Sequence, residues 1–144
     1  MSNKTKRILR YISFLPASIA TGIIVPFLFI LVAAWAGSPM VSGWTLEYLI
    51  LLPSTVMAGM VGGYLSIAIG IKVAPEKSIL ILVLLGASTA VFSADKIFIN
   101  WTLMATSAVH AQSIALFLGN ILYLITALAV LIFAYLNPDE DLLT

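Results

Sequence analysis

The sequence predicts an all-α fold: an integral membrane bundle of four transmembrane helices, with both termini in the cytoplasm. Of the 144 residues, 62% are hydrophobic and only 9% are charged, whereas soluble domains are about 25% charged. The charged residues lie in a few short stretches. The uncharged segments between them are long enough to cross a bilayer, which takes about 20 apolar residues. Residues 1–144 are therefore expected to form a single transmembrane domain.

The first crossing is expected over residues 11–36. No charged residue lies between Arg10 and Glu47, and the turn-forming Gly37-Ser38-Pro39 ends the apolar run. Pro26 stands in the middle of this helix, where it removes one backbone hydrogen bond and is expected to cause a kink. Two interpretations stay open: a static bend, or a hinge or freed carbonyl that coordinates a cation.

The other three crossings follow from the remaining charges and prolines. The second, 48–71, lies between Glu47 and Lys72, and the third, 75–94, begins at Pro75, which suits the first turn of a helix. The fourth is expected over 113–136 and is stopped by Pro138. Residues 95–112 are expected to form an outer segment, which is an interfacial helix, a loop or an extension of the third helix. Residues 137–144 form an acidic cytoplasmic tail.

The basic residues predict the orientation, because Lys and Arg are enriched in cytoplasmic loops. With four crossings and the N-terminus inside, the inside carries Lys4, Lys6, Arg7, Arg10, Lys72 and Lys77. Only Lys96 lies outside. We therefore expect a multi-pass protein of the plasma (inner) membrane, surrounded by the lipid bilayer.

Small residues mark one face of the second helix. Because apolar side chains gain little by leaving lipid, membrane helices associate through close backbone packing at small residues. A ridge with four-residue spacing and a GxxxG pair beside it form this small-residue face, which comprises Ser54, Ala58, Gly59, Gly62, Gly63, Ser66 and Gly70. The face is expected to meet either another helix of the same bundle, or a second copy or a larger membrane partner.

Few polar residues are available for chemistry. No acid or base lies near the middle of any expected crossing, although ion-coupled transporters place such residues there. Among the polar residues within the crossings, Asn120 has the highest free-energy cost of burial, since a buried amide needs hydrogen-bond partners. With Pro26 it marks a candidate polar path. An outer polar group is expected from Glu47, Asp95, Lys96 and His110. One histidine and distant acids are a weak metal signal, so we expect no catalytic, cofactor or metal site and no enzyme activity.

These observations favour a non-catalytic subunit or scaffold that packs with itself as a homodimer, or with a larger membrane partner, through the small-residue face. The alternative is a small dimeric transporter or channel for a small solute or ion. It draws on Pro26, Asn120 and a short likeness between residues 15–22 and 52–59, which would run in opposite directions as in inverted-repeat transporters. The net charge of +1, with no basic cluster beyond the N-terminus, excludes a nucleic-acid binder.

Overall fold

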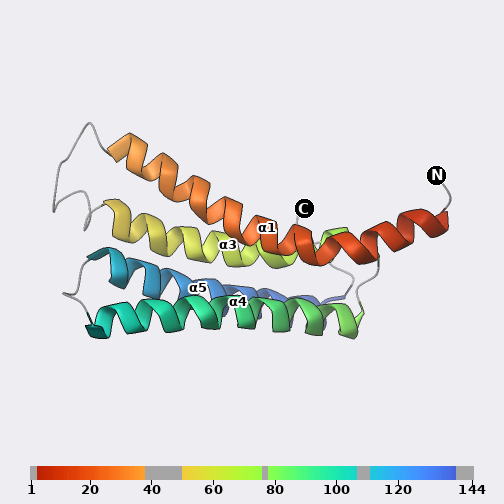
Figure 1. Ribbon diagram of the computed structural model, residues 1–144. Helices are drawn as coiled ribbons and strands as arrows, with labels where there is room; N and C mark the ends of the chain where they lie inside the picture. The colour runs from red at the N-terminus through yellow and green to blue at the C-terminus, as the bar shows by residue number, and fades with distance from the viewer. Residues whose placement is uncertain (1–2, 38–49, 76–77, 107–110, 139–144) are drawn as a thin grey trace.

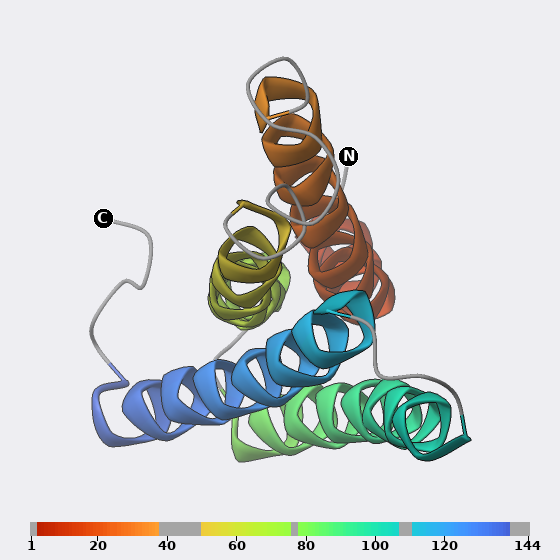
Figure 2. The same ribbon diagram turned by 90° about the vertical axis from the view of Figure 1, so that its left-hand side faces the viewer.

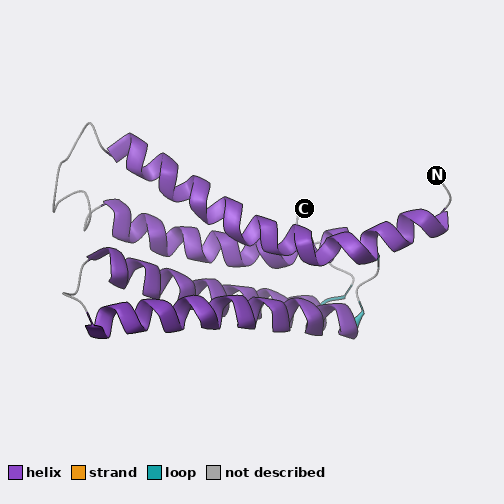
Figure 3. Cartoon of the chain, viewed as in Figure 1, coloured by secondary structure: helices purple, strands orange, loops and turns teal. Residues whose placement is uncertain are grey.

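The protein is described by a computed structural model that covers residues 3–37, 50–75, 78–106 and 111–138. Within these ranges the chain forms four long helices, which are α1 (Asn3–Gly37), α3 (Leu52–Val73), α4 (Ile79–Thr106) and α5 (Ala111–Leu136). Successive helices run in opposite directions along the bundle (Figure 1), and the described part of the chain is helical almost throughout (Figure 3). Each helix is long and apolar enough to span a membrane. The predicted all-helical fold, with four helices of membrane-spanning length, is thus confirmed for the described residues.

The helices pack in the order α1, α3, α5, α4. α3 makes extensive contacts with both α1 and α5, α4 packs mainly on α5, and α1 and α4 touch only slightly. Viewed toward the bundle end, α1 and α3 form one pair and α4 and α5 the other (Figure 2). α1 and α4 stand first and last in this order, and they are therefore not packed against each other along their length.

The apolar core lies in the proximal half of the bundle, the half that holds the start of α1 and the end of α5. It is built by Phe14, Ile67, Ile71, Ala74, Ile81, Leu85, Ala127, Val130, Leu131 and Ala134. The distal half is looser, because no described side chain of α1 beyond Gly22 is buried. In Figure 1 the distal end of α1 diverges from the other three helices. The helix carries Pro16 and Pro26, which are the usual cause of such bending.

The small-residue face of α3 holds the bundle together from inside. Ala58 and Ser66 are fully buried, and a Cβ added at Gly59 or Gly63 would collide with the backbone of α5. Gly62 meets the ring of Pro26, and Gly70 meets Leu85 of α4.

Two polar members of this face are also satisfied within the chain. Ser54 is half-buried and donates a hydrogen bond to the Ile50 carbonyl at 2.6 Å. The Ser66 hydroxyl lies 3.1 Å from that of Ser18 on α1. Of the two interpretations of the face, the structure shows packing within the bundle. Docking of a second copy or a larger membrane partner stays a prediction.

The observed helix bounds differ from the expected ones in α1 and α4. α1 already begins at Asn3 rather than at residue 11. The third crossing, expected over 75–94, begins at Ile79 and continues to Thr106. Pro75 lies just after the end of α3, and its predecessor Ala74 caps that helix through a hydrogen bond from its backbone N–H to the Gly70 carbonyl.

Residues 95–106 therefore extend α4, which is one of the three alternatives for the outer segment. This stretch contains no Gly or Pro. Its polar side chains are also compatible with a helix, because Asn100 and Thr102 each donate to the carbonyl four residues earlier, at 2.8 and 2.9 Å. Glu47, Lys77, His110 and the acidic tail beyond Pro138 lie outside the described residues.

Candidate functional site: a cavity between the four helices

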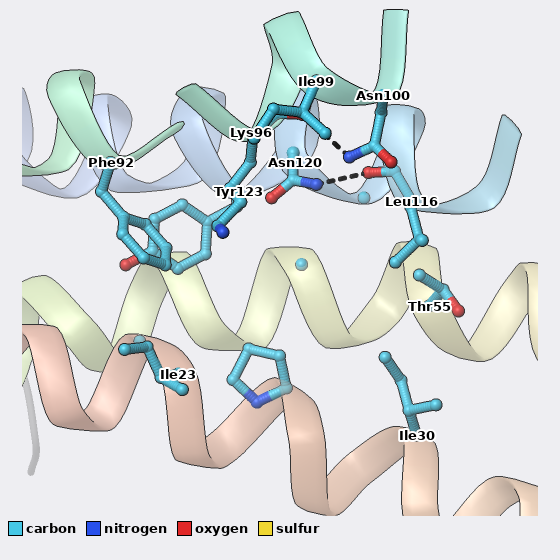
Figure 4. Close-up of a pocket in the computed structure, with 14 residues that line it drawn as sticks. Ile23, Ile30, Thr55, Phe92, Lys96, Ile99, Asn100, Leu116, Asn120 and Tyr123 are labelled. Carbon is cyan, nitrogen blue, oxygen red and sulfur yellow. Dashed lines mark hydrogen bonds between the residues drawn. The ribbon is translucent and has the colours of Figure 1, made fainter. Parts of the chain in front are cut away.

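All four helices line a cavity of about 370 Å³ in the distal half of the bundle (Figure 4). α1 contributes Gly22, Ile23, Pro26 and Ile30, and α3 contributes Thr55 and Gly59. α4 contributes Phe92, Lys96, Ile99 and Asn100, and α5 contributes Leu116, Gly119, Asn120 and Tyr123. A volume of this size lies at the lower end of the range of small-molecule sites, about 300–1,000 Å³.

Lys96 is the charged residue of the cavity wall. Its side chain runs from α4 toward Phe92 and Tyr123 (Figure 4), and its ammonium nitrogen lies 6.0 Å from the centre of the Phe92 ring. That distance is within the range of a cation–π contact. Among the described residues, no carboxylate pairs with this ammonium. The cavity therefore contains a positive charge whose only described electrostatic contact is an aromatic face.

Lys96 lies well inside the length of α4. About 15 Å of helix, at 1.5 Å per residue, separate it from the distal end of α4 at Thr106. The apolar span of this helix runs over Ile79–Ala105 and contains both Asp95 and Lys96. The third crossing was expected to end at residue 94, before both charges, so Asp95 and Lys96 lie within the observed helix rather than beyond its end.

Two amide side chains line the cavity near Lys96. Asn100 donates to the Lys96 carbonyl at 2.8 Å, and Asn120 donates to the Leu116 carbonyl at 2.6 Å. Each amide has two N–H donors and one oxygen acceptor. One donor and the oxygen of each therefore remain without a hydrogen-bond partner among the described residues. These groups are available to a bound molecule.

Tyr123 lines the proximal end of the cavity, and a small group of hydroxyl side chains lies behind it. The Tyr123 hydroxyl lies against Gly22 and beside the Ser66 hydroxyl, and the Ser66 hydroxyl donates to the Ser18 carbonyl at 3.0 Å. The Tyr123 ring packs against Phe92, with ring centres 6.1 Å apart. This group separates the cavity from the apolar core and has its own internal partners.

The structure brings together some of the predicted residues and not others. Pro26 and Asn120, the candidate polar path, both line the cavity. Of the expected outer polar group, Lys96 and Asp95 are both exposed, but only Lys96 lines the cavity. Glu47 and His110 lie outside the described residues, so the outer polar group as a whole stays a prediction.

Sequence reasoning did not single out Asn100 or Tyr123 as site residues. The signal for Asn100 is its four-residue spacing from Lys96, which places both on one helix face, but only if α4 continues past residue 94. Tyr123 is placed by contacts with α1 and α3, which no local pattern reveals. Within the described ranges, no three His, Cys, Asp or Glu side chains come together as metal ligands would.

A lysine ammonium with nearby amide donors is chemically suited to an anion, because charge-assisted hydrogen bonds are the stronger kind. Comparison of the chain with protein-family models, with curated protein sequences and with solved structures finds no match.

Proposed function

We propose that the protein is a small membrane-embedded binding protein that takes an anionic solute into its four-helix cavity, as a carrier or transporter does. The observation that carries this proposal is Lys96, whose ammonium lines the cavity without a described carboxylate partner. A lysine near the centre of a spanning helix costs about 2.5–3.5 kcal/mol on insertion, and such residues are typically functional. An anionic ligand would supply the missing counter-charge.

The two amides support the same proposal. Asn100 and Asn120 each have an N–H donor to spare near Lys96. A cavity wall with an ammonium and two spare amide donors suits a carboxylate, sulfonate or phosphate better than a cation. This favours an anion over the cation that a freed carbonyl at Pro26 would coordinate.

The expected role as a non-catalytic subunit receives less support. The small-residue face of α3 was expected to contact the partner, but α1 and α5 of the same chain cover this face. Assembly with a second copy or a larger membrane protein stays a prediction that needs another surface. We assign no enzymatic activity and no cofactor.

We further propose that the protein lies in the plasma (inner) membrane with both termini in the cytoplasm. The support is the sequence pattern alone: six of the seven Lys and Arg residues then lie on the cytoplasmic side or near it, as the positive-inside tendency predicts. The position of Lys96 within α4 does not alter this orientation, because the other basic residues lie near the N-terminus, in the last turn of α3 (Lys72) and between α3 and α4 (Lys77).

Anion binding to the purified full chain in nanodiscs of zwitterionic lipid tests the proposed function. Calorimetric titrations would use inorganic phosphate, methanesulfonate and octanesulfonate as probes. At least one probe is expected to bind saturably and to lose about tenfold or more in affinity in Lys96→Met, because a charged hydrogen bond contributes about 1.5–3 kcal/mol.

Two variants control this experiment. Lys96→Arg keeps the charge and is expected to retain most of the affinity. Lys72→Met removes an exposed charge at the proximal end of α3, away from the cavity, and is expected to bind as the unmodified chain does. If no probe binds, or if Lys96→Met binds as well as Lys72→Met, the proposed function is wrong.

A further inference from the structure

The cavity wall divides into a polar and an apolar part. The polar groups that face it without full hydrogen bonding are Lys96, Asn100 and Asn120, on α4 and α5. Opposite them, α1 contributes Ile23, Pro26 and Ile30, none of which has a side-chain donor or acceptor. Figure 4 shows this arrangement, with Lys96 and the amides on one side and the residues of α1 on the other. A ligand that fills such a site has a charged part and an apolar part.

The apolar side of the cavity reaches the outer surface of the bundle. Ile23 of α1 is 50% exposed and Ile99 of α4 is 44% exposed, although both line the cavity. These two residues belong to the helices that barely touch each other, α1 and α4. In a membrane, the surface between them faces acyl chains. The cavity can therefore be reached sideways from the bilayer.

The size of the cavity limits what it can enclose. Its volume of about 370 Å³ corresponds to roughly a dozen waters at about 30 Å³ each. That volume accommodates one anionic headgroup and a few methylene groups. The rest of any longer chain therefore lies outside the cavity.

We infer that the ligand is an anionic amphiphile, taken laterally from the bilayer, whose headgroup meets the cavity wall at Lys96, Asn100 and Asn120 and whose apolar part leaves between α1 and α4. This inference rests on the proposed function and narrows it to one class of ligand. The apolar lining from α1 and the surface-exposed lining residues Ile23 and Ile99 are what distinguish it from a site for a water-soluble anion.

The test compares two probes with the same headgroup, methanesulfonate and octanesulfonate, on the full chain in zwitterionic nanodiscs. Octanesulfonate is expected to bind about 100-fold more tightly, since each buried methylene contributes roughly a factor of four and three or four fit beside the headgroup. Octanesulfonate also partitions into lipid, so only the part of its binding that is lost in Lys96→Met is counted. If methanesulfonate binds equally well and depends on Lys96, the proposed function stands and the amphiphile inference fails.

Two further measurements test the route by which the ligand enters the cavity and the number of its acyl chains. Ile99→Trp narrows the exit between α1 and α4 and is expected to weaken octanesulfonate binding more than methanesulfonate binding. Val91→Trp is the matched control, because Val91 is 73% exposed on α4 and does not line the cavity. Equal effects of the two tryptophans would overturn the lateral route. Displacement of octanesulfonate by added phosphatidylglycerol would identify a two-chain lipid as the ligand, and its absence would assign the site to single-chain amphiphiles.

Discussion

At the scale of single residues, glycine decides how closely the helices approach. Gly59 lies directly on the backbone of Gly119, and Gly63 lies on the backbone of Tyr123. At both positions the obstacle to a side chain is main chain, which cannot rotate aside. Gly86 differs, because the nearest atom to an added Cβ is a Leu131 methyl at 3.3 Å. The glycines of this bundle are therefore not equivalent.

Replacing these glycines by alanine should separate the two kinds of position. Gly59→Ala is expected to destabilise the bundle by about 1–3 kcal/mol, the usual cost of overpacking. Gly86→Ala, the matched control, is expected to change stability by only a few tenths of a kcal/mol, since a leucine methyl can move. Thermal unfolding in detergent, followed by circular dichroism at 222 nm (the usual helix wavelength), measures both. Equal stability of the two variants would contradict the close backbone contact.

At the scale of helices, the form of α1 sets the shape of the site. Its proximal part is anchored by Phe14 and Ser18, which are buried, and by Gly22 under Tyr123. Pro26 follows, packed against Gly62, and beyond it the helix runs without a buried side chain in the described part. Because proline leaves the carbonyl one turn earlier without its backbone donor, Pro26 gives a physical reason for the divergence of the distal half. That divergence leaves room for the cavity.

Replacing Pro26 by alanine tests this account of α1. Pro26→Ala restores the backbone donor, so the distal half of α1 is expected to straighten and to change its distance from α3. Spin labels at Val32 and Met57, both exposed, report that distance by double electron–electron resonance. Pro53→Ala is the control, because Pro53 lies in the first turn of α3, where a missing donor does not matter. An unchanged distance distribution in Pro26→Ala would remove Pro26 as the cause.

At the scale of the whole molecule, the bundle has two unlike halves. The proximal half contains the apolar core, and the distal half contains the cavity with Lys96. Even numbers of crossings return the chain to its starting side, so Asn3 and Pro138 lie at the same end of the described bundle. If the proposed orientation is right, the cavity lies in the half of the protein nearer the outside.

Cysteine labelling tests that orientation. The chain has no cysteine, so single replacements report one position each. Thr102→Cys, exposed near the distal end of α4, is expected to react with a membrane-impermeant maleimide in intact cells. Thr5→Cys, exposed near the start of α1, is expected to react only after the membrane is permeabilised. The reverse labelling pattern would place the termini outside.

Much of the fold was predictable from local patterns. The four apolar segments followed from the spacing of charges, since crossing a bilayer needs a minimum apolar length. The small-residue face of α3 followed from four-residue spacing. For the candidate site, Pro26 was identified because it removes a backbone hydrogen bond within a helix, and Asn120 because its amide is costly to bury. Both residues line the cavity. The end of α4 was not predictable, because charged and amide residues can either end a helix or continue it.

The sequence by itself determined that the chain forms four spanning-length helices and that one of them carries a close-packing face, because apolar length and small-residue spacing are local properties. Tertiary structure decided which helices cover that face, that Lys96 lies deep within α4 beside Asn100, and that Asn120 and Pro26 share a cavity with them. The physical reason is that a cavity exists only where side chains from distant segments fail to fill the space between their helices. That outcome depends on how the helices bend and pack against one another.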